Sequence, residues 1–177
     1  MIELYYDSYS VAYFLVSQEI GSRSQMELLE KIFDEEYAFI YPVYADNKKE
    51  FFSDVLYWTD YLVDKKKLDK EFPAIEKDFK AAGRKFVKED YASDYPEFDL
   101  FFMIMRLRIL YTGNKDYVRM KLRTLLRHYG YKRRNAAING HIRDCMMFYH
   151  IQPYLKNEHE CFISEIGLDD MITFRVM

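Results

Sequence analysis

The sequence is poor in the features that mark secreted and membrane-spanning chains. Two cysteines, Cys145 and Cys161, among 177 residues are too few for the disulfide framework of a small secreted domain. The acidic Glu3 and Asp7 stand where a secretion signal carries positive charge, and no small-residue cleavage site follows them. The longest apolar run, residues 100–110, is interrupted by arginine and is shorter than the roughly 20 residues that a bilayer span needs. We therefore expect a cytoplasmic protein with buried thiols and no contact with a membrane.

Sequence signatures of enzymes are absent too. None of the six glycines belongs to a phosphate-binding loop or a nucleophile elbow. His141 and Cys145 lie four residues apart, but their spacing to the other histidines matches no zinc motif. Asp78 and Lys80 are similar to the acid-x-Lys end of a metal-dependent nuclease, yet they fall in a helical pattern and not on a strand. The sequence predicts a protein that is not an enzyme and holds no metal or cofactor, with a metal-dependent nuclease as the alternative.

The chain does have apolar bulk and charge. Half of its residues are hydrophobic, 31% are charged, and 17 tyrosines and 14 phenylalanines supply large side chains. This is the composition of a globular protein, so no disordered segment is expected. The length suits one compact domain, or a helical domain that carries a smaller module.

Charge is distributed unevenly along the chain. Residues 1–100 hold 22 acidic and 13 basic side chains. Residues 103–143 reverse this balance, with eleven Lys or Arg against Asp116 alone. Opposite charges separated by sequence predict two surfaces with different partners, or one surface that shields the other. Solvated charges and ion pairs with the acidic half are the alternatives.

Residues 1–95 predict an acidic, aromatic-rich bundle of three or four helices. Ser24 and Glu27 have the spacing of a capping box at the start of one helix, and Pro42 is placed to end it. The predicted helices span about 10–20, 25–39, 48–66 and a segment that begins at Pro73.

Acidic residues of this half form a candidate partner-binding surface. They lie beside many tyrosines, a combination that would imitate nucleic acid toward a basic partner or serve an aromatic-rich homodimer. The prediction favours the homodimer. The residues are Asp34, Glu35, Glu36, Asp60 and Asp64.

Residues 96–177 predict a smaller, basic module. Residues 101–111 suit a helix or a strand, because periodicity does not decide between them over so short an apolar run. A helix then begins near Asp116 and ends at Gly130. Its predicted apolar stripe is Val118, Leu122, Leu125 and Tyr129.

A second helix and a hairpin are expected to complete this module. The helix runs from its N-cap Asn135 to Pro153, after which residues 159–166 and 171–176 alternate like two paired strands. The residues predicted to face inward from the helix are Ile138, Ile142, Cys145, Met146 and Tyr149.

The basic helix and the turn after it are the candidate nucleic-acid-binding site. Arg119, Arg123 and Arg127 lie four residues apart, so a helix would place them in one stripe with about 6 Å per step, close to the spacing of phosphates. The turn precedes a helix, whose free amides and dipole favour an anion. That turn consists of Lys132, Arg133, Arg134 and Asn135. The candidates for reading base edges are Asn139, His141 and Arg143.

Two stretches of this half resemble a winged helix-turn-helix. The first helix and turn of such a module are similar to K-L-R-T-L-L-R-H-Y-G-Y-K-R-R-N, and its recognition helix to A-A-I-N-G-H-I-R-D-C-M-M-F-Y-H. The resemblance covers about residues 101–177. It implies a mainly α fold with a small β-hairpin, in which an amino-terminal helical bundle precedes a winged-helix-like module. Asp169 and Asp170 depart from the pattern, since winged-helix proteins often carry basic residues at the hairpin tip.

The sequence therefore predicts an accessory or regulatory protein of phage or mobile-element type. Its expected partner is duplex DNA or a nucleic-acid-bound protein machine, held mainly through phosphate contacts. A small chain with acidic and basic parts and no visible chemistry also resembles anti-CRISPR proteins in general character. That resemblance implies an alternative function, an inhibitor that binds an RNA-guided DNA nuclease and blocks its nucleic-acid binding or cleavage.

Overall fold

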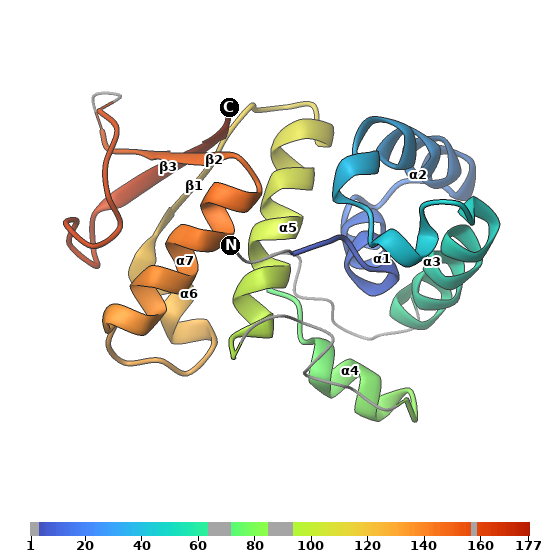
Figure 1. The fold of residues 1–177 in the computed structure, drawn as a ribbon, viewed down its shortest axis with the longest axis horizontal. Helices are drawn as coiled ribbons and strands as arrows, with labels where there is room; N and C mark the ends of the chain where they lie inside the picture. Colours follow the sequence, from blue (N-terminus) through green and yellow to red (C-terminus); the bar gives the residue numbers. More distant parts are fainter. Residues whose placement is uncertain (1–3, 64–71, 85–93, 157–158) are drawn as a thin grey trace. The chain divides into compact units, whose positions relative to one another are not determined.

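The computed structural model describes residues 4–63, 72–84, 94–156 and 159–177. The protein is mainly α-helical with a small antiparallel sheet, as predicted (Figure 1). Its described residues form two compact units, one of residues 4–84 and one of residues 94–177. The boundary predicted at residues 95 and 96 falls at the start of the second unit.

The first unit contains four α-helices and two short 3-10 helices among its described residues. Their bounds are α1 Ser8–Ser17, α2 Ser22–Glu35, η1 Tyr37–Phe39, η2 Pro42–Tyr44, α3 Lys48–Val63 and α4 Ile75–Ala81. The predicted capping box is wrong, because Gly21 is the N-cap of α2 and Ser24 lies inside the helix. Pro42 opens η2 several residues after α2 has ended, where its fixed φ suits a first helical turn.

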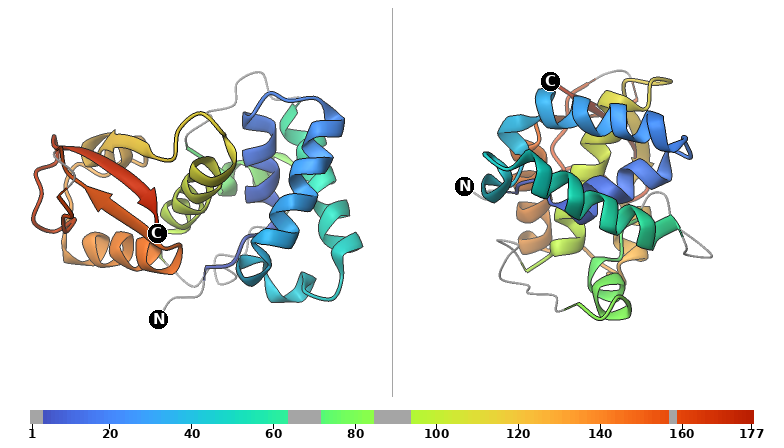
Figure 2. Two further views of the ribbon diagram at one scale, coloured as in Figure 1. Left: turned by 90° about the horizontal axis from the view of Figure 1, so that it is seen from above. Right: turned by 90° about the vertical axis from the view of Figure 1, so that its right-hand side faces the viewer.

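The buried helix α1 is the centre of the first unit and packs against both α2 and α3 (Figure 2). Aromatic rings dominate this core. Tyr9 meets Trp58 edge-on at 5.3 Å between ring centroids, and Trp58 lies 4.6 Å from Phe79 of α4. The Tyr9 hydroxyl donates to the buried Asp78 carboxylate at 2.6 Å, and burial followed by this negative charge raises the Tyr9 pKa. Asp78 of α4 thus forms a buried hydrogen bond with Tyr9 of α1 in the core.

The second unit begins with helix α5, Pro96–Tyr111, which resolves the choice between strand and helix for this segment. Pro96 occupies the first turn together with the acidic Glu97 and Asp99, all favourable at a helix start. A helix separates positions 106 and 108 by about 200°, whereas a strand would place them on one face. Arg106 is accordingly buried, and its guanidinium donates to the Tyr149 carbonyl at 2.6 Å.

The remaining elements of the second unit alternate between sheet and helix. They are β1 Val118–Lys121, α6 Leu122–His128, α7 Ala136–Phe148, β2 Ile151–Tyr154 and β3 Met171–Val176. The strands lie in the order β1-β3-β2, and both outer strands run antiparallel to β3. In the left view of Figure 2, α7 runs along one side of this sheet.

Two predictions of strand position are wrong. Residues 118–121, predicted to belong to a helix, form strand β1. Val118 and Met120 are buried in it, and the residues between and after them are exposed. The strand paired with β3 at this end of the chain is β2 and not residues 159–166, in which Glu160 forms an isolated bridge with Tyr154. Pro153 therefore lies in an edge strand, where its missing N–H is tolerated, instead of ending α7.

The helix-turn-helix itself follows the sequence closely. Gly130 adopts φ +81° after α6, a left-handed conformation that glycine adopts without strain. The Asn135 side chain caps α7 by accepting a hydrogen bond from the Ile138 amide at 2.9 Å, as predicted. All five residues predicted to face inward from this helix are buried.

None of the described helices is both long and apolar enough to cross a membrane.

Asn135→Ala should destabilise the second unit by about 1 kcal/mol, because the Ile138 amide loses its acceptor at the start of α7. Asn135→Ser is the matched control, since a serine hydroxyl also caps helices. Urea denaturation followed by circular dichroism measures both free energies of unfolding. Equal values for the alanine and serine variants would show that the cap contributes nothing.

Candidate nucleic-acid interface

The predicted stripe of three arginines is not present. Arg119 lies on β1, whereas Arg123 and Arg127 lie on α6. The Arg119 Nε donates to Thr173 Oγ1 on the neighbouring β3 at 3.1 Å, so this side chain belongs to the outer face of the sheet. The change from strand to helix at Leu122 therefore divides the basic residues between two surfaces.

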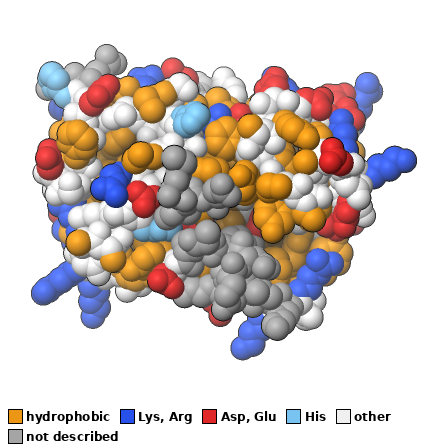
Figure 3. Space-filling model, viewed as in Figure 1, with side chains coloured by type: hydrophobic (Ala, Val, Ile, Leu, Met, Phe, Trp, Pro, Cys, Tyr) orange, Lys and Arg blue, Asp and Glu red, His pale blue; other side chains and the backbone are white. Residues whose placement is uncertain are grey.

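The first surface, here called the α6–turn surface, consists of α6 and the turn that follows it. Arg127, Lys132 and Arg133 are exposed there, and the structure gives these three no hydrogen bond or ion pair with any described residue. A hollow of about 330 Å³ opens beside them, lined in part by Arg127, Tyr131 and Lys132. Figure 3 shows Lys and Arg side chains projecting at the lower left, in the region of α6, α7 and their connection.

Arg123, at the edge of this hollow, is held by the tip of the β2–β3 connection. Its guanidinium donates to both carboxylate oxygens of Asp169, at 2.7 and 2.8 Å, and its backbone amide donates to the Leu168 carbonyl at 3.0 Å. The hydrogen bonds from Arg123, together with its charge and those of Lys121 and Arg127, lower the Asp169 pKa. The acidic tip that departs from winged-helix proteins thus neutralises one of the predicted phosphate ligands.

Arg134 also has an internal role. Its guanidinium donates to the backbone carbonyl of Ile163 at 2.7 Å and to that of Ile166. These bonds attach the turn before α7 to the segment that leads into the hairpin tip. Within the predicted basic turn, Lys132 and Arg133 are therefore the two side chains that remain available to an anion.

The prediction that His141 reads base edges is wrong, because its ring is 7% exposed and its Nε2 atom is hydrogen-bonded to Asp99 on α5. Cys145 lies one turn further along α7 on the same inward face and was correctly predicted to be buried. Asn139 is half-buried, and Arg143 is exposed and forms an ion pair with the adjacent Asp144 at 3.2 Å. These two remain on the outer side of α7.

Asp99, His141 and Cys145 form a buried polar cluster between α5 and α7. The Cys145 sulfur lies 3.4 Å from the Asp99 Oδ1 atom and 3.5 Å from the His141 Nε2 atom. Carboxylate, imidazole and sulfur are zinc ligand types, and one atom of each lies within 4.8 Å of the others. Burial, followed by the nearby Asp99 charge, raises the Cys145 pKa well above its ordinary value and so favours the neutral thiol over the thiolate that binds metal.

The cluster thus joins two helices by hydrogen bonds, and a structural zinc site would need a fourth ligand. Asp99 was not predicted from the sequence, because the choice between helix and strand was left open for the segment that follows it. The signal for His141 was present, since it lies four residues before a cysteine already predicted to face the core.

The second basic surface lies on the outer face of the sheet. Tyr117 has three cations over its ring, with the Arg119 guanidinium at 5.2 Å, the Arg175 guanidinium at 5.4 Å and the Lys115 ammonium at 5.5 Å. Arg175 also pairs with Asp116 at 3.1 Å. In this group Arg119 and Arg175 lie on strands β1 and β3, and Lys115 and Tyr117 lie just before β1, apart from the α6–turn surface.

The predicted acidic surface is only partly present in the first unit. Asp34, Glu35 and Asp60 are exposed, and Asp34 lies 3.6 Å from the Lys48 ammonium. Glu36 does not belong to the surface, because it is 5% exposed and accepts a hydrogen bond from the Tyr6 hydroxyl at 2.8 Å. Asp64 lies outside the described residues.

Comparisons with protein-family models, with curated proteins and with solved structures find no significant match to this chain.

Both cysteines, which are free and buried as predicted, should resist modification in the folded protein. At pH 8 a raised pKa keeps Cys145 as the neutral thiol, and burial raises the pKa of Cys161 in the same direction. Ellman's reagent should therefore react slowly with the native protein and rapidly with both thiols in denaturant. Rapid labelling of native Cys145 would contradict the buried cluster.

Proposed function

We propose that the second unit is a winged-helix-like module that binds duplex DNA through phosphate contacts and serves an accessory or regulatory role without catalysing a reaction. The observation that carries this proposal is the set of exposed cations Arg127, Lys132 and Arg133, which form no hydrogen bond or ion pair with the residues that the structure describes. Arg127 and Lys132 line a hollow, and Arg133 follows Lys132 in the chain. Exposed charges placed together without counter-ions favour a polyanion.

The order of elements supports the same proposal. Helix α6, a tight turn, helix α7 and the closing strands β2 and β3 follow one another as in the helix-turn-helix modules that the sequence resembles. The first turn of α7 lies directly after Lys132 and Arg133, so its amides and dipole add to the attraction for a phosphate. Two free, buried thiols agree with a reducing compartment such as the cytoplasm.

Contact with bases falls in this proposal to Asn139 and Arg143 on the outer side of α7. Few base-reading groups remain once His141 is assigned to the core. Phosphate contacts position a protein on DNA without selecting a sequence. We therefore expect affinity in the micromolar range, little sequence preference and strong dependence on salt.

The combined variant Arg127→Ala, Lys132→Ala and Arg133→Ala tests the proposed interface. Each lost phosphate contact lowers the slope of log affinity against log salt by about 0.9, so the variant should lose about 2.7 units. Fluorescence anisotropy with a labelled duplex between 50 and 200 mM salt measures the slope.

The matched control removes the same charge from exposed lysines of the first unit, Lys49→Ala, Lys77→Ala and Lys80→Ala. It should keep a slope close to that of the original chain. Equal losses in the two variants would mean that net charge, and not the α6–turn surface, governs binding.

Asp169→Asn should strengthen DNA binding. The substitution removes the charge that neutralises Arg123, so one more guanidinium becomes available to phosphate and the salt slope steepens by up to about 0.9. Asp116→Asn is the control, because it frees Arg175 on the sheet face by the same change of charge. A similar gain in both variants would argue against a specific role for the hairpin tip.

A second candidate function is an anti-CRISPR-type inhibitor that binds an RNA-guided DNA nuclease. The observation in its favour is the first unit's exposed Asp34, Glu35 and Asp60, with Tyr37 and Tyr41 47% and 43% exposed. Tyrosine is enriched in protein interfaces, and carboxylates imitate phosphate toward a basic channel. Capture of a protein from the native host that persists after nuclease treatment, together with no duplex binding at low salt, would favour this function over the first.

A further inference from the structure

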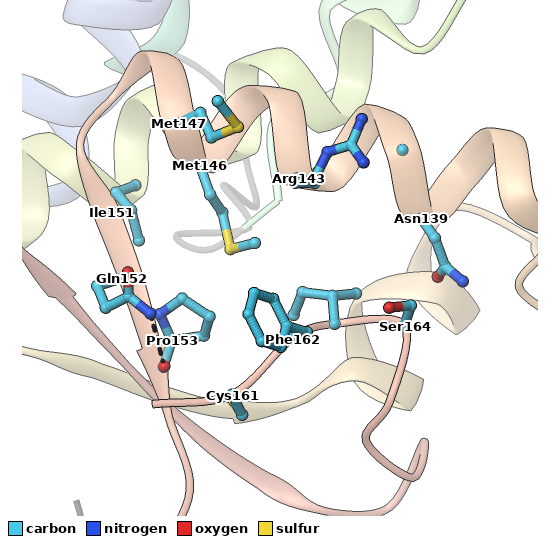
Figure 4. A pocket seen from close by; sticks show the side chains of 12 residues that line it. Asn139, Arg143, Met146, Met147, Ile151, Gln152, Pro153, Cys161, Phe162 and Ser164 are labelled. Atoms are coloured by element: carbon cyan, nitrogen blue, oxygen red, sulfur yellow. Dashed lines mark hydrogen bonds between the residues drawn. The ribbon is translucent and has the colours of Figure 1, made fainter. Parts of the chain in front are cut away.

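A pocket of about 380 Å³ lies beside the outer side of α7, within the second unit. One wall is α7 and the opposite wall is the segment 161–164, with the start of β2 closing one end. Figure 4 shows Met146 and Asn139 reaching from α7 toward Phe162 and Ser164, with Arg143 between them on the helix. The volume falls in the range of about 300–1,000 Å³ that small-molecule sites occupy.

The apolar lining of this pocket is partly open to solvent. Phe162 is 70% exposed and Met147 is 65% exposed, whereas Met146 and Ile151 are buried at its base. An apolar ligand in the pocket would cover this phenyl ring and this thioether. Removing their apolar surface from water is favourable. The pocket therefore favours a ligand with an aromatic or aliphatic body.

Two polar groups give the pocket a chemical preference. The Asn139 Oδ1 atom is buried without a hydrogen-bond partner in the described structure, so it lacks a donor. Arg143 is the one charged side chain among the described residues that line the pocket, and none of these residues carries a carboxylate. An ion pair joins Arg143 to Asp144 on its own helix, with both side chains exposed, and such pairs are weak.

We propose that this pocket binds a small aromatic acid. The ring system packs on Phe162 and Met146, the acidic group pairs with Arg143, and an N–H or O–H of the ligand donates to Asn139 Oδ1. A buried acceptor is costly when it has no donor, so a ligand that supplies one is selected over a purely apolar molecule.

A ligand in this pocket would also regulate DNA binding, an inference that rests on the proposed function. Asn139 and Arg143 are the two side chains of α7 assigned to base contacts, and the ligand engages both. Bound ligand and bound DNA therefore compete, and by linkage each lowers the affinity for the other by the same factor.

The probe 8-anilinonaphthalene-1-sulfonate has all three features: aromatic rings, an N–H donor and an anionic group. Its fluorescence should rise saturably with one probe per chain. Arg143→Gln should weaken binding about tenfold, since one ion pair is lost, and Asn139→Leu and Phe162→Ser should weaken it as well. Arg23→Gln is the matched control, because it removes an exposed arginine of the first unit that, like Arg143, pairs with a carboxylate of its own helix, and it should leave probe binding unchanged.

Equal probe binding by the Arg143→Gln and Arg23→Gln variants, or no saturable binding by the original chain, would overturn the site. Phe162→Ser keeps the test valid if Arg143→Gln does not fold, since Phe162 is on the surface. Competition is measured separately, by adding the probe to the complex with labelled duplex. Probe binding without DNA binding would refute the proposed function and leave the pocket, whereas DNA binding without probe binding would refute the pocket alone.

Discussion

Hydrogen bonds between buried polar groups attach α7 to α5 and determine which face of α7 is exposed to solvent. Asp99 of α5 bonds His141, and Arg106 of α5 bonds the carbonyl of Tyr149 just after α7 ends. His141 lies near the middle of α7 and Tyr149 just after its end, so the two links, about two turns apart, fix both its rotation and its position along α5. Breaking either one would remove a hydrogen bond between buried groups, and a hydrogen bond to a charged group contributes about 1.5–3 kcal/mol.

With that face fixed, the stripe Asn139, Arg143 and Met147 lies on the outer side, since residues four apart share one side of a helix. Both proposals about the second unit use residues of this stripe. It borders the α6–turn surface through the N-terminal turn of α7 and the pocket through segment 161–164. Ligand and nucleic acid thus depend on the same orientation of one helix.

The basic residues of the second unit are divided between stability and surface charge. Arg106 and Arg134 donate to backbone carbonyls, and Arg123 is neutralised by Asp169. Arg127, Lys132 and Arg133 form no hydrogen bond or ion pair with another residue of the described ranges. A count of positive charge along the sequence therefore overestimates the charge offered to a partner, because it does not separate guanidinium groups that complete the fold from those that face solvent.

Several helix boundaries of this chain could be predicted, because capping and turn residues act on their own neighbours. The strands could not, because a strand depends on a pairing partner that lies far away in the sequence. Gly130 and Asn135 act through their own neighbours, so the turn and the start of α7 follow from the sequence. Val118 and Met120 suit a strand only because β3, which pairs with them, follows some 50 residues later. The site was predicted in part: Lys132 and Arg133 are exposed as expected.

The residues that were misplaced share one physical cause. Arg119, His141 and Glu36 each took their role from a partner far along the chain: Thr173, Asp99 and Tyr6. Sequence periodicity indicates which side of a helix or strand a residue occupies. It does not indicate which polar group of another element the residue will contact. A carboxylate or imidazole on an inward face needs such a partner, and the partner is known only when the fold is known.

A nitrogen-15 NMR titration of the whole chain with a short duplex tests the central claim most directly. The account predicts that shifted amide signals at low salt concentrate in α6, in the turn through Asn135 and in the first turns of α7, and that they revert as salt is added. Shifts confined to residues 4–84, or an unchanged spectrum at low salt, would contradict it.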